Sequence, residues 1–507
     1  MPSFPKQNQL LMRIILLFFL LFLSVMPYLQ AQEVSDALLF SETQPIITAR
    51  SIGVGNALGA LGGDLSTASR NPAGLAIYRR AEFSFSVGSF GEATQTNFFG
   101  NNERTRQSRV AFGSTGLLIP TRIHRDSDWK MVNVGMTFNR LANFDRSFSY
   151  SGTSTGSRVQ AIADQAQGLS DINSDPYQAG PAYQAYLIDD LGGGTYTANG
   201  GAEDPNSLVD KSETFTRSGG INELGITLGG NYNNKLYLGA SLGVNFLNFR
   251  EDRLYSEYTP DLEYISMDLS ETRSVEGVGL NLKLGMIYRI NKIFRVGAAV
   301  HTPTAYRLTD SYNTGMNAAI IYNDTLRESV FAMEDQDPNV LQHNMSSPWT
   351  FVLSGGAVIA KRGFIGVDIE YLDFGTASFS LLENERTPAN NQFINNVNNN
   401  VEDSYQGVVR VRVGGELAFG LARFRLGYQF QSSPYEVAVA GVSDFRHDIS
   451  AGIGVRWKHF YLDAAYQHTL REFEYSPYAT NINLQRITGN ITNSQIMFTL
   501  GILMFRD

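Results

Sequence analysis

The chain has 507 residues, and its 40 Lys and Arg against 49 Asp and Glu give a net charge of −9 without a basic stripe, which argues against nucleic-acid binding. It contains no cysteine, which excludes disulfides, thiolate metal sites and cysteine nucleophiles. Beyond residue 26 no run of about 20 apolar residues occurs, which excludes a bundle of membrane-spanning helices.

Residues 1–31 have the pattern of a secretory signal peptide. Lys6 and Arg13 give a positive start, an apolar core follows from Ile14 to Val25, and Ala31 provides a small residue for cleavage before Gln32. The alternative is an N-terminal anchor helix, which the absence of a stop-transfer flank disfavours. We therefore expect an exported protein.

A glycine- and alanine-rich segment from Arg50 to Tyr78 follows, with a helical turn expected over 57–61 and a chain turn at Asn71-Pro72. Its G-x-G-x-x-x-G spacing differs from the dinucleotide fingerprint, and neither a preceding strand nor a βαβ unit accompanies it. We predict that residues 32–80 form a plug, with the glycines packing its backbone closely.

From Ala81 onward, bulky apolar residues alternate with small or polar ones in about fourteen runs. In residues 236–246, for example, one face is apolar and the other carries Tyr, Gly, Ser and Asn. Such a two-faced strand is typical of a transmembrane β-barrel, with one face toward lipid and one toward the lumen. The sequence therefore predicts an all-β fold, a transmembrane antiparallel β-barrel over residues 81–507.

The runs come in pairs joined by a few residues, whereas the connections between pairs are long. We expect long loops near 250–271, 311–347, 381–403, 432–446 and 476–490, and the largest at about 149–220, with short helices near 158–169 and 182–191. Short turns on one side and long loops on the other are typical of outer-membrane barrels. Aromatic residues near strand ends favour membrane-interface girdles over ordinary core packing: Trp129, Tyr288, Trp349, Tyr371, Tyr428, Trp457, Tyr461 and Tyr466.

The segments 49–57 and 64–75, the second ending in Asn71-Pro72-Ala73-Gly74-Leu75, resemble the hatch of the FadL-type outer-membrane transporters. Residues 428–434, ending in Ser-Pro, are a weaker match, and the strand count agrees. Some related sequences are labelled hemin receptors. Two features depart from the family: the 149–220 loop is longer, and the chain ends in Phe505-Arg506-Asp507 rather than on an aromatic residue.

The resemblance implies a monomeric barrel plugged by an N-terminal hatch. A hydrophobic ligand, such as a long-chain fatty acid, is caught by extracellular loops, passes an internal site and leaves sideways through the wall. The residues expected to form the hatch and gate passage are Gly53, Gly55, Asn71, Pro72 and Gly74.

Several strands carry charge on the face predicted to point into the lumen, because a charge facing lipid at the membrane midplane costs about 2–4 kcal/mol. One interpretation is a self-neutralising network. The other is that a basic residue binds a ligand carboxylate, for which Arg410, Arg412 and Lys283 are the candidates.

No nucleophile elbow, acid/base carboxylate pair or zinc motif is evident, and the six histidines do not pair at metal-ligand spacing. We therefore expect no enzyme activity, no metal and no cofactor. The predicted function is passive outer-membrane transport of hydrophobic compounds. The expected partners are the ligand, membrane lipid and the barrel assembly machinery. The alternatives are a surface or adhesive barrel that binds a partner through its long loop, and a diffusion porin.

Overall fold

The fold comes from a computed structural model that describes residues 28–123, 127–259, 264–322, 325–332, 339–359, 362–383, 386–437, 445–478 and 485–504. Most of the predicted signal peptide and the chain end at 505–507 lie outside these residues. Within the described ranges, none of the helices has both the length and the hydropathy needed to cross a membrane.

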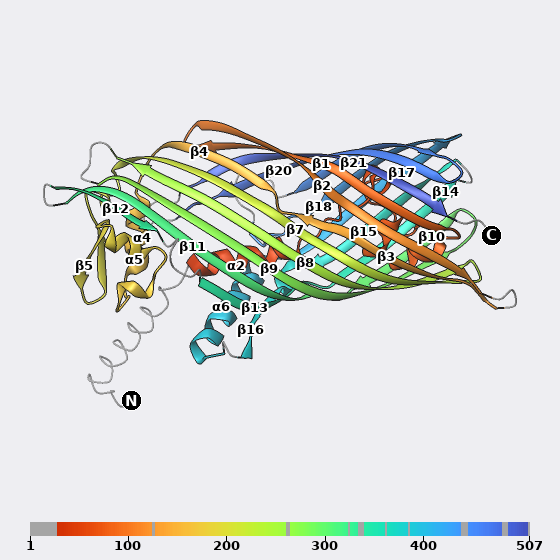
Figure 1. Ribbon diagram of the computed structural model, residues 1–507, viewed down its shortest axis with the longest axis horizontal. Coiled ribbons are helices and arrows are strands. Elements are labelled where there is room, and N and C mark those ends of the chain that lie inside the picture. Colours follow the sequence, from red (N-terminus) through yellow and green to blue (C-terminus); the bar gives the residue numbers. More distant parts are fainter. Residues whose placement is uncertain are drawn as a thin grey trace, which may run out of the picture.

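One closed antiparallel sheet forms the wall of a long barrel (Figure 1). Its strands are β1 (Ala81–Phe98), β2 (Asn101–Arg122), β3 (Trp129–Asn143), β4 (Arg146–Thr155), β7 (Leu208–Tyr232), β8 (Leu236–Tyr258), β9 (Tyr264–Arg289), β10 (Phe294–His301), β11 (Ala305–Tyr322), β12 (Thr325–Ala332), β13 (Asn339–Ser346), β14 (Thr350–Ile359), β15 (Gly363–Asp373), β16 (Ser378–Leu381), β17 (Gly407–Phe419), β18 (Ala422–Gln431), β19 (Arg446–Arg456), β20 (Phe460–Tyr475) and β21 (Ile487–Met504). The pairing of β1 with β21 closes the sheet.

The described strands occupy fourteen positions around the wall, which confirms the predicted barrel. Three positions consist of two consecutive strands each, namely β3 with β4, β10 with β11, and β15 with β16, and a fourth position consists of β12, β13 and β14. In β17, Val409 and Val413 are exposed on the outer face, whereas Arg410 and Arg412 are buried inside. The alternation in the sequence therefore marks the lipid-facing and lumen-facing sides, as predicted.

The strands extend further at the long-loop end of the barrel than the sequence predicts. β8 runs to Tyr258 and β4 and β7 extend into the predicted 149–220 loop, which leaves only residues 156–207 between them. The reason is a reversal of the pattern beyond the lipid-facing band: in β8, Leu247 and Phe249 are buried while Asn248 and Arg250 are exposed. Outward residues become polar there, so the lipid pattern disappears while the strand continues.

Most of the predicted girdle aromatics lie on the outer face, with 38–49% of their surface exposed. Tyr461 does not, because it has the opposite phase to its neighbours Phe460 and Leu462. It is only 4% exposed, and its hydroxyl donates a 2.8 Å hydrogen bond to Glu82. The prediction that Tyr461 belongs to a girdle is therefore wrong.

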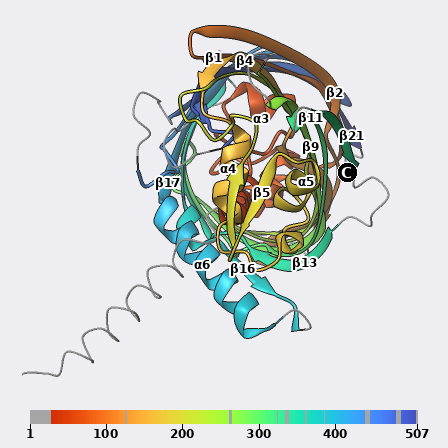
Figure 2. The same cartoon turned by 90° about the vertical axis from the view of Figure 1, so that its left-hand side faces the viewer.

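The N-terminal segment fills the lumen (Figures 1 and 2). It contains α2 (Tyr28–Ser41), α3 (Ala49–Gly53) and the 3₁₀ helices η1 (Leu65–Ser69) and η2 (Pro72–Ile77). Residues 57–61, expected as a helical turn, form an irregular turn instead. Residues 49–76 are almost all buried, since α3 packs on β19 and β20 and η2 packs on β7 and β8. We call residues 49–78 the hatch and residues 42–48 the lead.

A cap of residues 157–207 lies across the mouth at the long-loop end (Figure 2). It consists of α4 (Arg158–Ala166), η3 (Ile172–Ser174), α5 (Ala179–Gln184), β5 (Ile188–Gly192) and β6 (Thr195–Ala198), so the helix predicted over 182–191 is shorter and earlier and is followed by a strand. Outside the wall, α6 (Pro388–Ser404) packs beside β16 and against α2, and η5 (Phe374–Thr376) joins β15 to β16.

Candidate functional site

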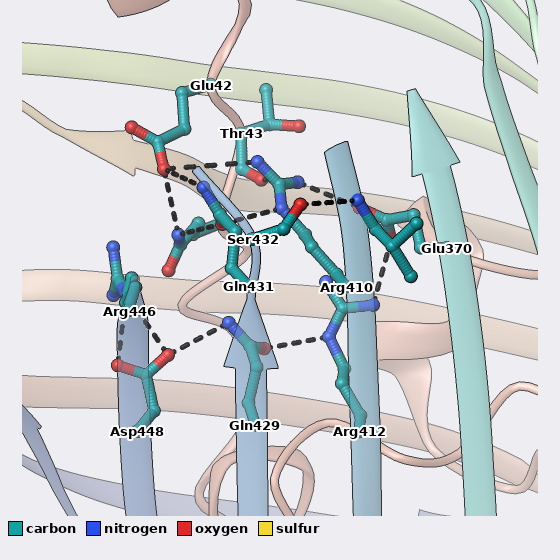
Figure 3. Close-up of polar contacts among 12 residues, drawn as sticks. Glu42, Thr43, Glu370, Arg410, Arg412, Gln429, Gln431, Ser432, Arg446 and Asp448 are labelled. Carbon is teal, nitrogen blue, oxygen red and sulfur yellow. Dashed lines mark hydrogen bonds and ion pairs between the residues drawn. The ribbon is translucent and has the colours of Figure 1, made fainter. Parts of the chain in front are cut away.

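The two arginines of β17 lie in a buried polar network with neighbouring strands (Figure 3). Arg410 Nη1 is 2.8 Å from Glu370 Oε1, and Arg412 Nη1 is 3.0 Å from Glu370 Oε2. Arg410 Nε donates to Gln431 and Arg412 Nε donates to Gln429, each at 2.8 Å. Both arginine side chains are only 1% exposed. One carboxylate therefore bridges two guanidinium groups in the interior.

The same network holds the lead in place. Arg410 Nη1 donates a 3.1 Å hydrogen bond to the carbonyl of Thr43, and Gln431 Nε2 donates one of 3.1 Å to Glu42. Burial alone would raise the pKa of Glu42, but the positive charges of Arg410, Arg446 and Arg471 bring that pKa below its usual value. The lead thus enters the lumen between charged side chains of the wall.

Lys283, the third predicted ligand residue, forms a buried ion pair with Glu223. The other oxygen of Glu223 accepts a 2.7 Å hydrogen bond from Ser69 of the hatch. Arg410, Arg412 and Lys283 therefore each have a carboxylate partner within the protein. Their role in binding a ligand carboxylate stays a prediction, and it would require exchange of these partners.

The hatch fits against the wall through its small residues. Gly55 has φ of 59°, and a methyl group there would lie 2.9 Å from the backbone nitrogen of Tyr428. At Gly53 a methyl group would lie 3.2 Å from the Cα of Gly452 in β19. Glycine on both sides thus lets two backbones approach each other, and the residue at Gly55 must also adopt a left-handed conformation.

The Asn-Pro-Ala-Gly element ends the hatch. Asn71 Oδ1 accepts from the backbone nitrogen of Ala73 at 3.2 Å and so caps η2, whose first residue is Pro72. Asn71 Nδ2 donates to the carbonyl of Gly59 at 2.7 Å, and the carbonyl of Gly74 accepts from Gly63 at 3.2 Å. These contacts tie the hatch together, while the gating role of these residues stays a prediction.

The wall has a seam between β2 and β4. β2 pairs with β3 only over residues 114–122, and β2 residues 101–113 pair only with β1, while β4 pairs only with β7 among the described strands. From Arg140 onward, the edge of β3 pairs with the lead instead of with β2. The backbone nitrogens of Gln44 and Ile46 donate hydrogen bonds to the carbonyls of Leu141 and Arg140 there. One ion pair crosses the seam, from Arg109 Nη1 to Asp145 Oδ1 at 3.1 Å. Nearer the long-loop end, Ser149 and Ser151 of β4 donate side-chain hydrogen bonds of 2.6 and 2.5 Å to Glu103 of β2.

A cavity of about 180 Å³ lies beside the seam and extends into the lumen. We call it the seam cavity. Part of its lining is apolar, from α2, the lead, β1 and the β3–β4 joint, and the rest is polar, with seven arginines among neutral amide and hydroxyl side chains. The apolar lining residues include Leu39, Ile46, Phe90, Ala142 and Phe144, and the charged ones are Glu42, Arg70, Glu92, Arg109, Asp145, Arg146, Arg217, Arg412, Arg446 and Arg471.

Three of the lining arginines have no ion pair with any described residue: Arg70, Arg146 and Arg471. Sequence analysis missed all three. Arg146 and Arg471 lie beyond the lipid-patterned runs, and Arg70 was considered only as part of the hatch motif. Its place directly before Asn71-Pro72 is the one signal that could have pointed to it. Among the described residues, no group of three or more His, Asp or Glu lies close enough to hold a metal ion.

A family model described as BamG matches residues 195–460 of this chain, which is more than half of its length. Among curated proteins, no sequence matches the chain.

Solved structures of similar fold include the toluene transporter TodX of P. putida and a FadL homologue of Pseudomonas aeruginosa. TodX has a TM-score of 0.53 and 12% sequence identity, over 92% of this chain and 100% of TodX. The FadL homologue has a TM-score of 0.52 and 14% identity, over 90% of this chain and 98% of that protein. At this level of identity the likeness concerns the fold of the barrel.

Proposed function

The chain belongs to the BamG family, and we propose that it is a bacterial outer-membrane transporter through which hydrophobic compounds diffuse passively. The observation that carries this proposal is the seam cavity, because it lies between a plugged lumen and the part of the wall where β2 and β4 share no backbone ladder. The fold that the chain shares with a toluene transporter and a FadL homologue supports it.

The proposed route follows the features of the barrel. Short turns of outer-membrane barrels face the periplasm and long loops face outward, so the cap covers the extracellular mouth. A ligand such as a long-chain fatty acid or an aromatic hydrocarbon enters beside the cap, reaches the seam cavity and leaves sideways between β2 and β4. The ligand partitions from the cavity into the apolar bilayer, so no energy source is needed.

Movement of the hatch would open this route. The lead occupies the edge of β3 that β2 leaves free, and it is continuous with the hatch. A displacement of the hatch would therefore pull Gln44 and Ile46 from this edge and enlarge the seam. Gly55 and the Asn71-Pro72-Ala73-Gly74 element are the positions where we expect this movement to begin.

Uptake across a closed seam tests the lateral route. The chain has no cysteine, so Arg109→Cys and Asp145→Cys can be joined specifically across the seam with a short bismaleimide. We expect uptake of radiolabelled oleate and toluene by cells to fall at least about fivefold after cross-linking. The unmodified double variant and each single variant treated with the reagent are the controls. Full uptake through a cross-linked seam would contradict lateral exit.

A second candidate function is partner binding. The name BamG hints at barrel assembly, and the cap and the outer helix α6 offer surfaces that the transport route does not use. In that case the barrel would anchor a complex of outer-membrane proteins. Cells lacking the protein would then keep normal hydrophobic uptake, and the protein would co-purify with another barrel in mild detergent.

A further inference from the structure

We propose that the seam cavity binds the phosphate head of a single-chain amphiphile, with Arg70, Arg146 and Arg471 as the residues that hold it. This inference rests on the proposed function, because it names the class of ligand that the cavity takes. It differs from the predicted site, since Arg410, Arg412 and Lys283 already have carboxylate partners inside the protein.

The lining of the seam cavity contains more basic than acidic side chains. Seven arginines and three carboxylates line the cavity. Four of the arginines form ion pairs: Arg109 with Asp145, Arg217 with Glu251, Arg412 with Glu370, and Arg446 with Asp448. Of the lining carboxylates, Glu42 interacts with Arg410 and Asp145 with Arg109. The lining thus retains three arginines and one carboxylate that form no ion pair with a described residue.

Arg70 shows that the excess charge lies inside the protein rather than at its surface. The residue is 6% exposed, and its Nη1 atom is buried without a hydrogen-bond partner among the described residues. The carboxylates of Asp368 and Glu370 are near enough to act on Arg70 electrostatically, but neither forms an ion pair with it. A buried guanidinium with an unmade hydrogen bond is unfavourable. A bound anion would supply the missing partner, and Arg70 lines the seam cavity as well as a smaller cavity beside Lys283 and His301.

Arg146 and Arg471 bring the second and third charges to the same space. Arg146 lies 4.3 Å from the ring centroid of Phe473, and its Nε and Nη2 atoms are buried without hydrogen bonds to described residues. Arg471 is near enough to repel it electrostatically. Glu92 and Glu42 are the nearby carboxylates. Glu92 accepts hydrogen bonds from Ser147 and Thr94, and Glu42 accepts one from Gln431. Both carboxylates act on Arg471 electrostatically, but neither forms an ion pair with Arg146 or Arg471.

The unmade hydrogen bonds of Arg70 and Arg146 indicate the head group. A phosphomonoester carries about −1.5 to −2 at pH 7 and offers three strong acceptor oxygens, whereas a carboxylate carries a single charge and two oxygens. Guanidinium groups recognise phosphate through paired hydrogen bonds. A hydrocarbon accepts no hydrogen bond from the arginines, an alcohol has one oxygen, and a carboxylate has two acceptor oxygens to share among three guanidinium groups.

The neighbourhood of the basic groups indicates a ligand with an apolar chain. Leu39, Ile46, Phe90 and Phe144 line the same cavity, and the seam beside it leads to the outer face of the wall. An amphiphile could place its head against the arginines and its chain along this apolar lining. Free inorganic phosphate shares the head-group chemistry but does not use the apolar part.

Calorimetric titration of the full chain in phosphatidylcholine nanodiscs, with empty nanodiscs subtracted, tests the proposal. The probes are dodecyl phosphate, dodecanoate, dodecanol and inorganic phosphate. We expect dodecyl phosphate to bind at least about tenfold more tightly than dodecanoate, and dodecanol and inorganic phosphate to bind more weakly still. Equal affinity for dodecyl phosphate and dodecanol would overturn the proposal. If dodecanoate bound as tightly as dodecyl phosphate, the assignment of a phosphate head would be wrong. If inorganic phosphate bound as tightly as dodecyl phosphate, the apolar chain of the ligand would have no role.

Variants connect the affinity to the named residues. Arg70→Gln and Arg471→Gln should each weaken dodecyl phosphate binding about 10- to 100-fold, because each removes charged hydrogen bonds to the ligand. The matched control is Arg122→Gln, an exposed arginine on the same strand as Arg109 but at the opposite end of the barrel. The thermal stability of ligand-free Arg70→Gln should fall little, because among the described residues Arg70 forms no ion pair and its Nη1 atom has no hydrogen-bond partner.

Unchanged dodecyl phosphate affinity in both variants would also overturn the proposal. Its failure is distinguishable from failure of the proposed transport function, because toluene uptake does not depend on a head group. Loss of toluene uptake on cross-linking the seam, together with head-group-independent binding, would retain transport and reject the phosphate site.

Discussion

Glu370 is the residue on which the buried network of β17 depends. Glu370→Gln would leave Arg410 and Arg412, each 1% exposed, without their shared carboxylate. We expect the free energy of unfolding to fall by about 3–5 kcal/mol, because an unpaired buried charge is left behind. Urea unfolding of the protein in lipid vesicles measures this free energy. Glu276→Gln, at an exposed glutamate of β9, should change stability by less than about 0.5 kcal/mol. Equal losses in the two variants would contradict this account.

At the scale of single residues, the sequence predicts which face of the wall a side chain lies on, but not which residue it contacts. Period-2 phase correctly placed Arg410 and Arg412 in the lumen, because a charge cannot face lipid cheaply. It could not show that Glu370 bridges them, since that contact depends on the register of β15 against β17. Nor could it separate the paired arginines from Arg70, because pairing is a property of the folded lumen.

The hatch and the wall meet through glycine, and two positions in the hatch separate backbone strain from packing. Gly55 and Gly63 have φ of 59° and 70°, but a methyl group at Gly55 meets Tyr428 whereas one at Gly63 meets nothing within 4 Å. Both alanine variants carry the cost of a left-handed conformation, about 1 kcal/mol. Gly55→Ala should in addition displace the hatch.

We expect Gly55→Ala to raise single-channel conductance in planar bilayers, and Gly63→Ala to leave the conductance at its native level. Deletion of residues 50–76 should give a larger increase than either substitution if the hatch blocks the lumen. A native conductance in the deletion variant would show that another part of the chain closes the barrel. A large steady conductance in the native protein would instead favour the diffusion porin.

At the scale of elements, the sequence predicts strands where lipid imposes the pattern and fails where it does not. The run at 236–246 is found as predicted, because bulky residues must face the bilayer there. Beyond it the same strand keeps its inward and outward positions, but the inward ones become apolar. Leu247 and Phe249 there belong to a core shared with α2 and α6. No local sequence pattern marks the seam. β2 and β4 each have the pattern of an ordinary strand, and the missing backbone ladder between them is a property of the folded barrel.

For the whole molecule, the distribution of loop lengths correctly predicts a barrel with two different ends. The position of the cap could not be predicted in this way. Its core combines Val159, Ile162 and Leu187 of the cap with Tyr255 and Met267 of the wall. These residues are far apart in sequence, and their contact follows from closure of the barrel rather than from any local pattern.

Removal of the cap separates the two candidate functions. The backbone nitrogen of Gly156 donates a 3.3 Å hydrogen bond to the carbonyl of Ser207, so a short Gly-Ser linker can replace residues 157–207 without moving β4 or β7. The ladder between these strands does not involve the cap, so the barrel should still fold.

If the protein is a transporter, hydrophobic uptake by cells should be retained or increased, because the extracellular mouth is less covered while the seam remains. If the cap instead binds a partner, cells with the native protein, cells with the variant and cells without the protein should all take up hydrophobic compounds equally. The partner should then no longer co-purify with the variant. A fall of uptake to the level of cells without the protein, with the variant still folded in the membrane, would show that the cap itself is required for capture of the ligand.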